Sequence, residues 1–223
     1  MDTQLLELFK IHKTFDNFIT LNDDPIVTVL KSYSNQFIHL TGVKDTGKTH
    51  LLEAWVNQKK PNSIYIDANF LFSDFANIID KFLYIAIDNI DTLDHNQQTI
   101  IFNLFNTIKL NNKKNMLLTS SSNVIDKLPS FRDDVRTRIL SGLNINLKAL
   151  DDDEILKNIT VFIKKEAINI GDHELNYLIN HCKRNIGSLI NTINQIAEIS
   201  LLKNRHITIP LIKEVVGSDS FDL

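Results

Sequence analysis

One stretch of eight residues has the residue types and the spacing that bind a nucleotide phosphate. It fits the pattern G-x-x-x-x-G-K-[S/T] at every fixed position, and its members are Gly42, Val43, Lys44, Asp45, Thr46, Gly47, Lys48 and Thr49. The glycines let the backbone turn its amides toward phosphate oxygens, the lysine adds a positive charge, and the threonine hydroxyl is a ligand for Mg²⁺. The alternative is a chance match on a surface turn, but two of the chain's six glycines fall in this motif. The stretch therefore predicts a nucleotide site with Mg²⁺.

A second candidate group follows the apolar run FLYIAID at residues 82–88. Asp88 at its end is placed to hold Mg²⁺ with Thr49, although an acid here could also cap a strand-end turn. The next residue, Asn89, can orient a water molecule but cannot accept its proton. This predicts slow intrinsic hydrolysis, because Asp91 would substitute only if the strand continued to it.

Short apolar runs alternate with helix-period segments as far as residue 148, which positions these groups on an α/β fold. The runs are bounded by polar residues or glycine and are predicted to be strands at 36–42, 63–68, 82–88, 115–121 and 143–147. Amphipathic stretches at 48–59 and 97–110 are predicted to be helices between them. Such alternation predicts a parallel five-stranded sheet with helices on both faces.

From residue 151 onward the pattern is helical, and no strand is evident up to residue 205. Acids at 151–154 suit a helix N-terminus, Pro210 suits a first turn, and Gly217 is predicted to lie just past a helix end. We therefore predict an α/β nucleotide-binding domain at 14–148 and a small all-α domain at 149–217. A short N-terminal peptide, 1–13, precedes them, and a loose tail, 218–223, follows.

Composition narrows the class of protein. The net charge of −3 over 223 residues argues against a broad, nonspecific nucleic-acid surface. A single cysteine, Cys182, cannot form an internal disulfide, and neither a secretion signal nor a run of about 20 apolar residues is present. We expect a soluble cytoplasmic protein without a membrane segment. The spacing of His39, His50, His173 and His181 does not suggest a metal site.

Five segments resemble DnaA, the bacterial replication initiator of the AAA+ class, and occur in the same order. They are TFDNF (14–18), HLTGVKDTGKTHLLEA (39–54), YIAIDNID (84–91), LLTSS (117–121) and VRTRILSGLNINL (135–147). The layout is most similar to the Hda family, regulatory inactivators of DnaA, in which an asparagine also follows the strand-end acid. As in that family, the chain stops after the helical segment, and we expect no DNA-binding domain of the helix-turn-helix type.

The resemblance implies a fold, a function and partners. The fold is an AAA+ P-loop domain followed by an all-α lid. The function is negative regulation of replication initiation, in which the protein binds ADP or ATP with Mg²⁺ and stimulates hydrolysis of the ATP bound to DnaA. The implied partners are DnaA and the DNA polymerase III sliding clamp. Homo-oligomer formation stays open, and sequence-specific DNA binding is not expected.

Arg138, in RTRILSGL, matches the position of the family's arginine finger. A guanidinium beside a γ-phosphate stabilises charge in the transition state, and such fingers contribute about 10³–10⁵ in rate. The alternative is a surface cation or a salt bridge to Asp133 or Asp134. Arg132 and Arg136 are rival candidates for the finger.

The N-terminal stretch QLLELF, residues 4–9, resembles the family's clamp-binding peptide. Gln4, Leu5, Leu8 and Phe9 supply the expected residue types, whereas Glu7 stands where leucine is usual. The alternative is an amphipathic turn that packs on its own domain.

The remaining site residues are also implied by the resemblance. Phe15, Phe18 and Ile19 match a segment that packs on the adenine, although they are equally good core residues. His50 follows Thr49 as in DnaA and is expected to be a helix residue.

Two sensor positions depart from the family pattern. Ser121 stands where the first sensor is usually acidic, and local hydroxyl bonds at a strand end would explain it equally well. The Thr119–Ser121 segment is expected on a strand between the loop strand and the acid strand. Gly187 stands where the second sensor has an arginine, and Arg184 lies about one helical turn earlier.

Two other functions compete with DnaA regulation. An autonomous ATPase that loads or remodels a nucleic-acid complex, like helicase loaders of the DnaC type, would need competent hydrolysis and a basic face. A nucleotide-gated adaptor for a different partner is also compatible with the sequence.

Overall fold

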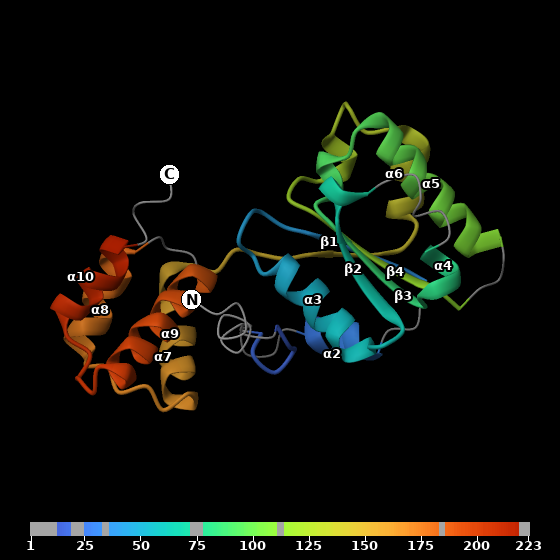
Figure 1. Ribbon diagram of the computed structural model, residues 1–223. Helices are drawn as coiled ribbons and strands as arrows, with labels where there is room; N and C mark the ends of the chain where they lie inside the picture. The colour runs from blue at the N-terminus through green and yellow to red at the C-terminus, as the bar shows by residue number, and fades with distance from the viewer. Residues whose placement is uncertain are drawn as a thin grey trace. The chain divides into compact units, whose positions relative to one another are not determined.

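The computed structural model describes residues 13–18, 25–32, 36–71, 78–110, 114–182 and 186–218. Contacts divide the chain into one unit at Met1–Ala149 and a second at Leu150–Leu223 (Figure 1). Among the described residues, no helix is both long and apolar enough to cross a membrane.

The first unit is built on a five-stranded sheet in which every neighbouring pair of strands is parallel. Its strands, each within the limits predicted from the sequence, are β1 (Phe37–Thr41), β2 (Ser63–Asp67), β3 (Tyr84–Asp88), β4 (Met116–Ser121) and β5 (Leu143–Asn146). They lie in the order β2-β3-β4-β1-β5. The strand of Thr119–Ser121 therefore lies between the loop strand and the acid strand, as predicted.

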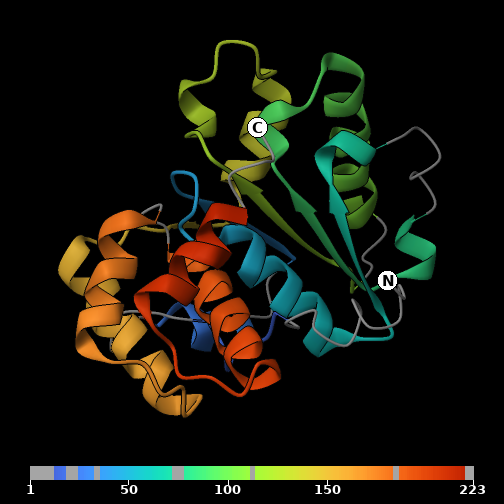
Figure 2. The ribbon, with the colours of Figure 1, turned by 60° about the vertical axis from the view of Figure 1, so that its left-hand side comes forward.

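Helices cover both faces of the sheet, which explains why its strands are apolar on both sides. One face packs on α2 (Ile26–Ser32) and α3 (Lys48–Lys59), and the other on α4 (Ile78–Lys81), α5 (His95–Leu110) and α6 (Asp133–Leu140) (Figures 1 and 2). In β3 the side chains alternate accordingly, because Ile85 and Ile87 enter one core and Ala86 the other. The sheet is thus buried between two apolar layers, with its strand ends at the edges.

Short 3₁₀ turns follow three strands at the carboxyl edge of the sheet. Ala68–Phe70 (η1) comes directly after β2, Ile90–Thr92 (η3) after β3, and Ile125–Lys127 (η4) after β4. In the registers, Asp67 pairs with Asp88 and Thr41 with Ser121, so the last residues of adjacent strands lie side by side. Polar residues at these positions therefore meet at one edge.

The described part of the second unit forms four helices around a core of its own. They are α7 (Asp152–Lys165), α8 (Asp172–His181), α9 (Ile186–Leu202) and α10 (Ile209–Ser218). The predicted acidic start of α7 is a capping box, because the Asp151 and Glu154 side chains each accept a hydrogen bond from the other's backbone N–H. Aliphatic side chains that recur at helical spacing, such as Leu189, Ile193 and Ile196 on α9, fill the core.

One predicted helix end in this unit is wrong. Gly217 was expected past the end of the last helix but lies inside α10, one residue before its end. A Cβ at Gly217 would meet no atom within 4 Å, so the position is open to solvent. An exposed glycine in a last turn does not force the backbone out of the helix, and helix ends are the least sharply determined part of a sequence pattern.

Candidate functional site

The predicted phosphate loop connects the end of β1 to the start of α3. Gly47 has φ 89°, the left-handed region that glycine adopts without a steric cost, and it directly precedes the first residue of the helix. A Cβ at Gly42 would lie 2.7 Å from both the Leu147 carbonyl oxygen and Thr46 Oγ1, which is too close for a side chain. Both glycines are therefore required by the shape of the loop, which presents the N-terminus of a 12-residue helix.

The lysine of the motif lies within the curve of this loop. Lys48 Nζ donates hydrogen bonds to the carbonyl oxygens of Gly42 (2.7 Å) and Val43 (2.8 Å), and the residue is only 5% exposed. Burial lowers the pKa of Lys48, while the nearby charges of Asp88, Asp91 and Asp45 oppose that shift. A buried ammonium beside a helix N-terminus gives the loop the positive potential that a phosphate needs.

Asp88 is completely buried at the end of β3 and accepts four hydrogen bonds. Oδ2 accepts from Thr49 Oγ1 (2.6 Å) and from the Tyr65 hydroxyl (2.9 Å). Oδ1 accepts from the Asn89 amide (3.0 Å) and from Ser120 Oγ. Burial and the neighbouring Asp88 charge raise the pKa of Tyr65, so its hydroxyl remains a donor.

The oxygen atoms of Asp88 and Thr49 are suitable ligands for Mg²⁺. A carboxylate and a threonine hydroxyl in direct contact are hard oxygen ligands, and Mg²⁺ in phosphate sites typically takes one or two protein oxygens and keeps several waters. Thr49 and Asp88 would hold the ion, whose contribution when bound is to neutralise phosphate charge. Within the part of the chain that the structure describes, no group of three or more His, Cys, Asp or Glu side chains forms another metal site.

Asn89 is turned toward the neighbouring strand. Its backbone is left-handed (φ 58°), and its Nδ2 donates to Asp67 Oδ2 at the end of β2 (2.9 Å). Asp67 Oδ1 in turn accepts from the backbone and the side chain of Asn69. The side-chain amide of Asn89 therefore forms its hydrogen bond with β2. No carboxylate stands at this position beside the loop.

Asp91 does not extend the line of the strand, because β3 ends at Asp88 and Asp91 lies in η3. Its Oδ2 accepts from the Ser122 amide (3.2 Å), the Asn123 amide (3.1 Å) and Asn123 Nδ2 (2.9 Å). This carboxylate therefore fastens η3 to the residues after β4. The condition under which Asp91 would replace a water-activating acid, a strand that continues, is not met.

The polar end of β4 divides its contacts between two neighbours. Ser120 reaches Asp88, whereas Ser121 Oγ donates to the Asn123 carbonyl (2.6 Å) and lies 3.2 Å from His39 Nε2. The other ring nitrogen of His39 lies 2.9 Å from Thr119 Oγ1. Burial lowers the pKa of His39 to about 4, so the ring is neutral at pH 7. Ser121 has the local hydroxyl bonds of the alternative interpretation, and a sensing role for it stays a prediction.

Residues 13–18 lie against α3 and the phosphate loop. The Thr14 carbonyl is 2.9 Å from His50 Nε2, and the Phe18 ring packs against the His50 ring at 5.3 Å between centroids. A Cβ at Gly47 would lie 2.6 Å from the Phe18 ring, so this ring directly covers the loop glycine. Phe15, at 8% exposed, belongs instead to the core under α3. Ile19 lies outside the described residues.

The arginines of α6 and its N-cap have different surroundings. Arg132 donates to Asp134 (2.5 and 3.1 Å) and to Thr99 Oγ1 (2.6 Å). Arg136 donates to Asp133 (2.7 Å) and to two backbone carbonyls. The predicted alternative of a salt bridge from Arg138 to either acid is therefore wrong, because both acids pair with the other arginines.

Arg138 is half-buried, and its Cζ lies 6.0 Å from the centroid of the Phe102 ring on α5. It has no hydrogen bond or ion pair to any residue that the structure describes. A guanidinium that rests on an aromatic ring keeps all five N–H donors available.

Comparison with known proteins shows what the two units of the chain resemble. A protein-family profile described as "Hda, lid domain" matches residues 146–216. This match covers less than half of the chain, and it shows that the helical second unit is similar to the lid domain of the Hda family. An uncharacterized protein of Haemophilus influenzae is 26% identical over 219 residues, which cover 92% of this chain and 93% of that protein.

Two solved structures show the fold. AMPPCP-bound DnaA from Aquifex aeolicus superposes with a TM-score of 0.68 at 24% identity, over 82% of this chain and 64% of that chain, less than two thirds of its length. Domain III of the Thermotoga maritima replication initiation protein DnaA gives a TM-score of 0.72 at 19% identity, over 92% of this chain and 96% of that chain. The five-stranded sheet of this chain is thus of the DnaA AAA+ type.

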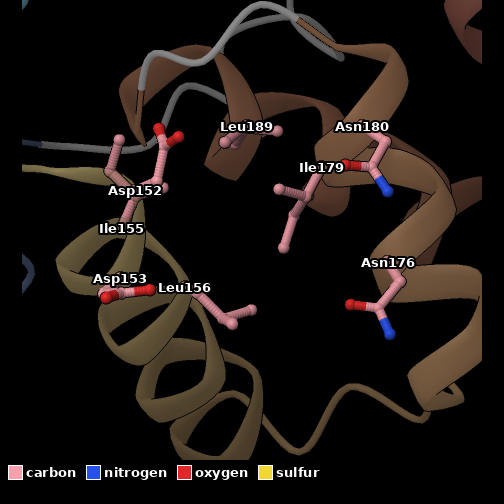
Figure 3. A pocket seen from close by; sticks show the side chains of 8 residues that line it. All are labelled: Asp152, Asp153, Ile155, Leu156, Asn176, Ile179, Asn180 and Leu189. Atoms are coloured by element: carbon pink, nitrogen blue, oxygen red, sulfur yellow. The ribbon is translucent and has the colours of Figure 1, made fainter.

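Within the described residues of the second unit, α7, α8 and α9 line a pocket of about 200 Å³ (Figure 3). Leu156 from α7 and Ile179 from α8 point into it from opposite sides. Its lining residues are Asp152, Asp153, Ile155, Leu156, Asn176, Ile179, Asn180 and Leu189. They include two carboxylates and no cation, so this cavity is unsuited to a phosphate, and none of the predicted site residues lines it.

The second-sensor position also lies in this unit. Gly187 is the second residue of α9 as the structure describes it, and residues 183–185 before it lie outside the described residues, so its role as helix entry stays a prediction. Arg184, like the clamp-peptide residues Gln4, Leu5, Leu8 and Phe9, lies outside the described residues.

The structure adds residues to the site that the sequence analysis did not single out. Tyr65 and Ser120 donate to Asp88, and Asp67 accepts from Asn89. Each lies at or near the carboxyl end of a strand next to β3. Polar residues near the ends of otherwise apolar strands were the available signal, because parallel strands bring their carboxyl ends to one edge.

Proposed function

We propose that this Hda-like protein binds ADP or ATP with Mg²⁺ and promotes hydrolysis of ATP bound to DnaA, with Arg138 as the group that it supplies to the partner's nucleotide. The single observation that carries the proposal is the contrast between Arg138 and its neighbours. Arg132 and Arg136 each form an ion pair and further hydrogen bonds within the chain, whereas Arg138 forms neither with any residue that the structure describes.

The phosphate loop supports nucleotide binding. Its two glycines, the buried Lys48 ammonium and the N-terminus of α3 form a cradle for an anion, and Thr49 beside Asp88 fits the metal ion of a nucleotide. A DnaA with the same fold has been solved with AMPPCP, an ATP analogue, bound. Phe18, which covers Gly47, lies where it can contact a nucleotide held in the loop.

The carboxyl edge supports weak hydrolysis by the chain itself. A water that attacks a γ-phosphate needs a group that orients it and accepts its proton. At the position after the metal-binding acid the chain has Asn89, which is engaged with Asp67. Asp91 lies in η3, off the line of β3, where its Oδ2 accepts from Ser122 and Asn123 and its Oδ1 is buried without a hydrogen-bond partner among the described residues. A nucleotide bound here would therefore be hydrolysed slowly, and its main effect would be to stabilise the conformation that binds it.

Arg138 supports action on a second molecule. A guanidinium contributes to phosphoryl transfer when it approaches the γ-phosphate of a neighbouring subunit, and it needs unpaired donors to do so. Arg138 Cζ lies 6.0 Å from the centroid of the Phe102 ring, and this contact uses none of those donors.

The clamp-binding part of the proposal rests on the sequence. The peptide of Gln4, Leu5, Leu8 and Phe9 would bury its apolar side chains in a pocket of the sliding clamp, where each contributes about 1.5–3 kcal/mol when fully desolvated. Clamp binding would concentrate the protein at sites of DNA synthesis. Replacing Leu8 and Phe9 with Ala is expected to abolish clamp capture, and unchanged capture would rule this part out.

The proposal is tested by reconstitution. ATP-loaded DnaA, DNA-loaded clamp and the protein are mixed, and phosphate release is followed with each component omitted in turn. Acceleration that requires all three components is the expected result. Phosphate release by the protein alone would instead support an autonomous ATPase, and nucleotide binding without any acceleration would support an adaptor for another partner.

A further inference from the structure

The Asp88 carboxylate has all of its acceptor sites filled by this chain's own donors. An ionised carboxylate offers about four lone-pair sites. Oδ2 accepts from Thr49 and Tyr65, and Oδ1 accepts from the Asn89 amide and Ser120. The group is fully buried, so solvent provides no further exchange partner. Any metal-bound water that donates to Asp88 must therefore displace one of these four donors.

The four donors differ in how easily they can give way. Thr49 Oγ1 is the hydroxyl of the phosphate loop, and it frees one site on Oδ2 when it rotates to offer its oxygen to a metal ion. The Asn89 amide is part of a left-handed turn, and Ser120 Oγ also accepts from that amide at 3.2 Å, so Oδ1 stays engaged. On Oδ2 one site is then open to a metal-bound water, and the Tyr65 hydroxyl continues to occupy the other.

Tyr65 is held rigidly in this position. It lies in the interior of β2, where it pairs with Ala86 of β3, and its side chain packs on the apolar layer under α3. A phenol hydroxyl lies at a fixed distance from the ring, so Tyr65 cannot withdraw from Oδ2 without a movement of the whole ring. Mg²⁺ keeps several of its waters, which need acceptors such as this oxygen.

We propose that Tyr65 is a positioning residue that competes with metal-bound water for Asp88 Oδ2 and thereby limits how much Mg²⁺ adds to nucleotide affinity. This inference rests on the proposed nucleotide binding and deepens it. It gives the chain a site that can retain a nucleoside diphosphate with a small dependence on the metal ion.

The test measures the Kd of a fluorescent ADP analogue for the full-length protein in EDTA and across a Mg²⁺ titration. The informative variant is Tyr65→Phe, which keeps the ring and removes the hydroxyl. The matched control is Tyr84→Phe, since Tyr84 lies on the adjacent strand, its ring packs against Trp55, and it does not contact Asp88. Thermal melts confirm that the variants are folded.

In EDTA the Kd of Tyr65→Phe should agree with wild type within about twofold, because Thr49, Ser120 and the Asn89 amide still hold Asp88. With Mg²⁺ the ratio of the two Kd values should rise roughly threefold to tenfold, the size expected when one competing hydrogen bond to a charged group is removed. The Mg²⁺ concentration for half-maximal effect should fall in parallel, and Tyr84→Phe should leave both quantities unchanged.

A purely structural role would change the melting temperature and leave the Mg²⁺ ratio of Tyr65→Phe at the wild-type value, which would overturn the inference alone. A smaller ratio would also overturn it, because Tyr65 would then assist the metal. A wild-type chain that binds no nucleotide under either condition would overturn the proposed nucleotide site as well.

Discussion

The charged groups at the carboxyl edge of the sheet are hydrogen-bonded within the chain, whereas Arg138 on helix α6 has no hydrogen bond to the described residues. At the edge, Asp88 accepts four hydrogen bonds and Lys48 donates to two carbonyls. On α6, Arg138 rests on Phe102 and has no ionic partner among the residues that the structure describes. A buried charge is stable only with partners, whereas an accessible cation needs none. Under the proposed function, the edge would hold the nucleotide and α6 would offer Arg138 to another molecule.

The largest effect is expected when the Arg138 guanidinium is removed. Arg138→Ala should reduce the stimulation of ATP hydrolysis by DnaA by about 10³-fold or more, the range of arginine fingers. Phosphate release in the reconstituted system measures the effect, and Arg132→Ala is the matched control because Arg132 is engaged by Asp134 and Thr99. Full stimulation by Arg138→Ala would move the role to another residue.

The phosphate loop is tested by removing the charge of Lys48. Lys48→Ala should weaken nucleotide binding by roughly two to three orders of magnitude, since it removes a buried, hydrogen-bonded charge from the phosphate site. Calorimetric titration with ADP measures the loss. Lys44→Ala in the same loop should bind normally, because Lys44 is exposed. Equal losses in the two variants would mean that the loop attracts phosphate only by its general charge.

His39 on β1, which is buried against the polar end of β4, should make the stability of the sheet sensitive to acid. The pKa of His39 is lowered from 6.5 to about 4 by burial, with Asp91 opposing the shift, so the unfolded chain takes up this proton first as the pH falls. Stability is therefore complete above about pH 6.5 and decreases by up to about 3 kcal/mol as the pH falls to 4.

Urea unfolding at several pH values measures this slope. His39→Gln should flatten it between pH 6.5 and 4, and His173→Gln, at an exposed position on α8, should leave it unchanged. The prediction fails if the His39 variant retains the wild-type slope.

The smallest effect is expected when a carboxylate is introduced at position 89. This variant tests whether the edge lacks only that group for ATP hydrolysis. Asn89→Asp should not accelerate ATP hydrolysis by the isolated protein, because the side chain is directed to Asp67. It should lower stability by about 1–3 kcal/mol, since a hydrogen bond is replaced by two adjacent carboxylates. The double variant Asp67→Asn/Asn89→Asp should recover most of the loss. A tenfold faster phosphate release by Asn89→Asp would show that the edge is one group short of an ATPase.

Much of the α/β unit was predictable because its signals are local. The five strands are short apolar runs between polar boundaries, and the observed strands fall within the predicted limits. The phosphate loop was predictable for the same reason, since its glycines are required by a backbone conformation at Gly47 and a close approach at Gly42. The end of α10 was not, because an exposed Gly217 leaves no signal strong enough to stop a helix.

The partners of the charged groups were less predictable. Asp133 and Asp134 are near Arg138 in sequence, yet they pair with Arg136 and Arg132 because of where each side chain projects from the helix. Tyr65 and Asp88 are separated by 23 residues, and their contact depends on the register between β2 and β3. Spacing along the chain carries no information about such register.

By itself, the sequence determined that this protein has a parallel α/β domain with a phosphate loop, followed by helices, because residue periodicity and glycine geometry act over a few neighbouring residues. The tertiary structure alone decided which donors surround Asp88, that Asn89 is directed to Asp67, and that Arg138 is the arginine left without an ionic partner in the described part of α6. Those outcomes depend on strand order, register and helix packing, which bring together side chains that are distant in the sequence.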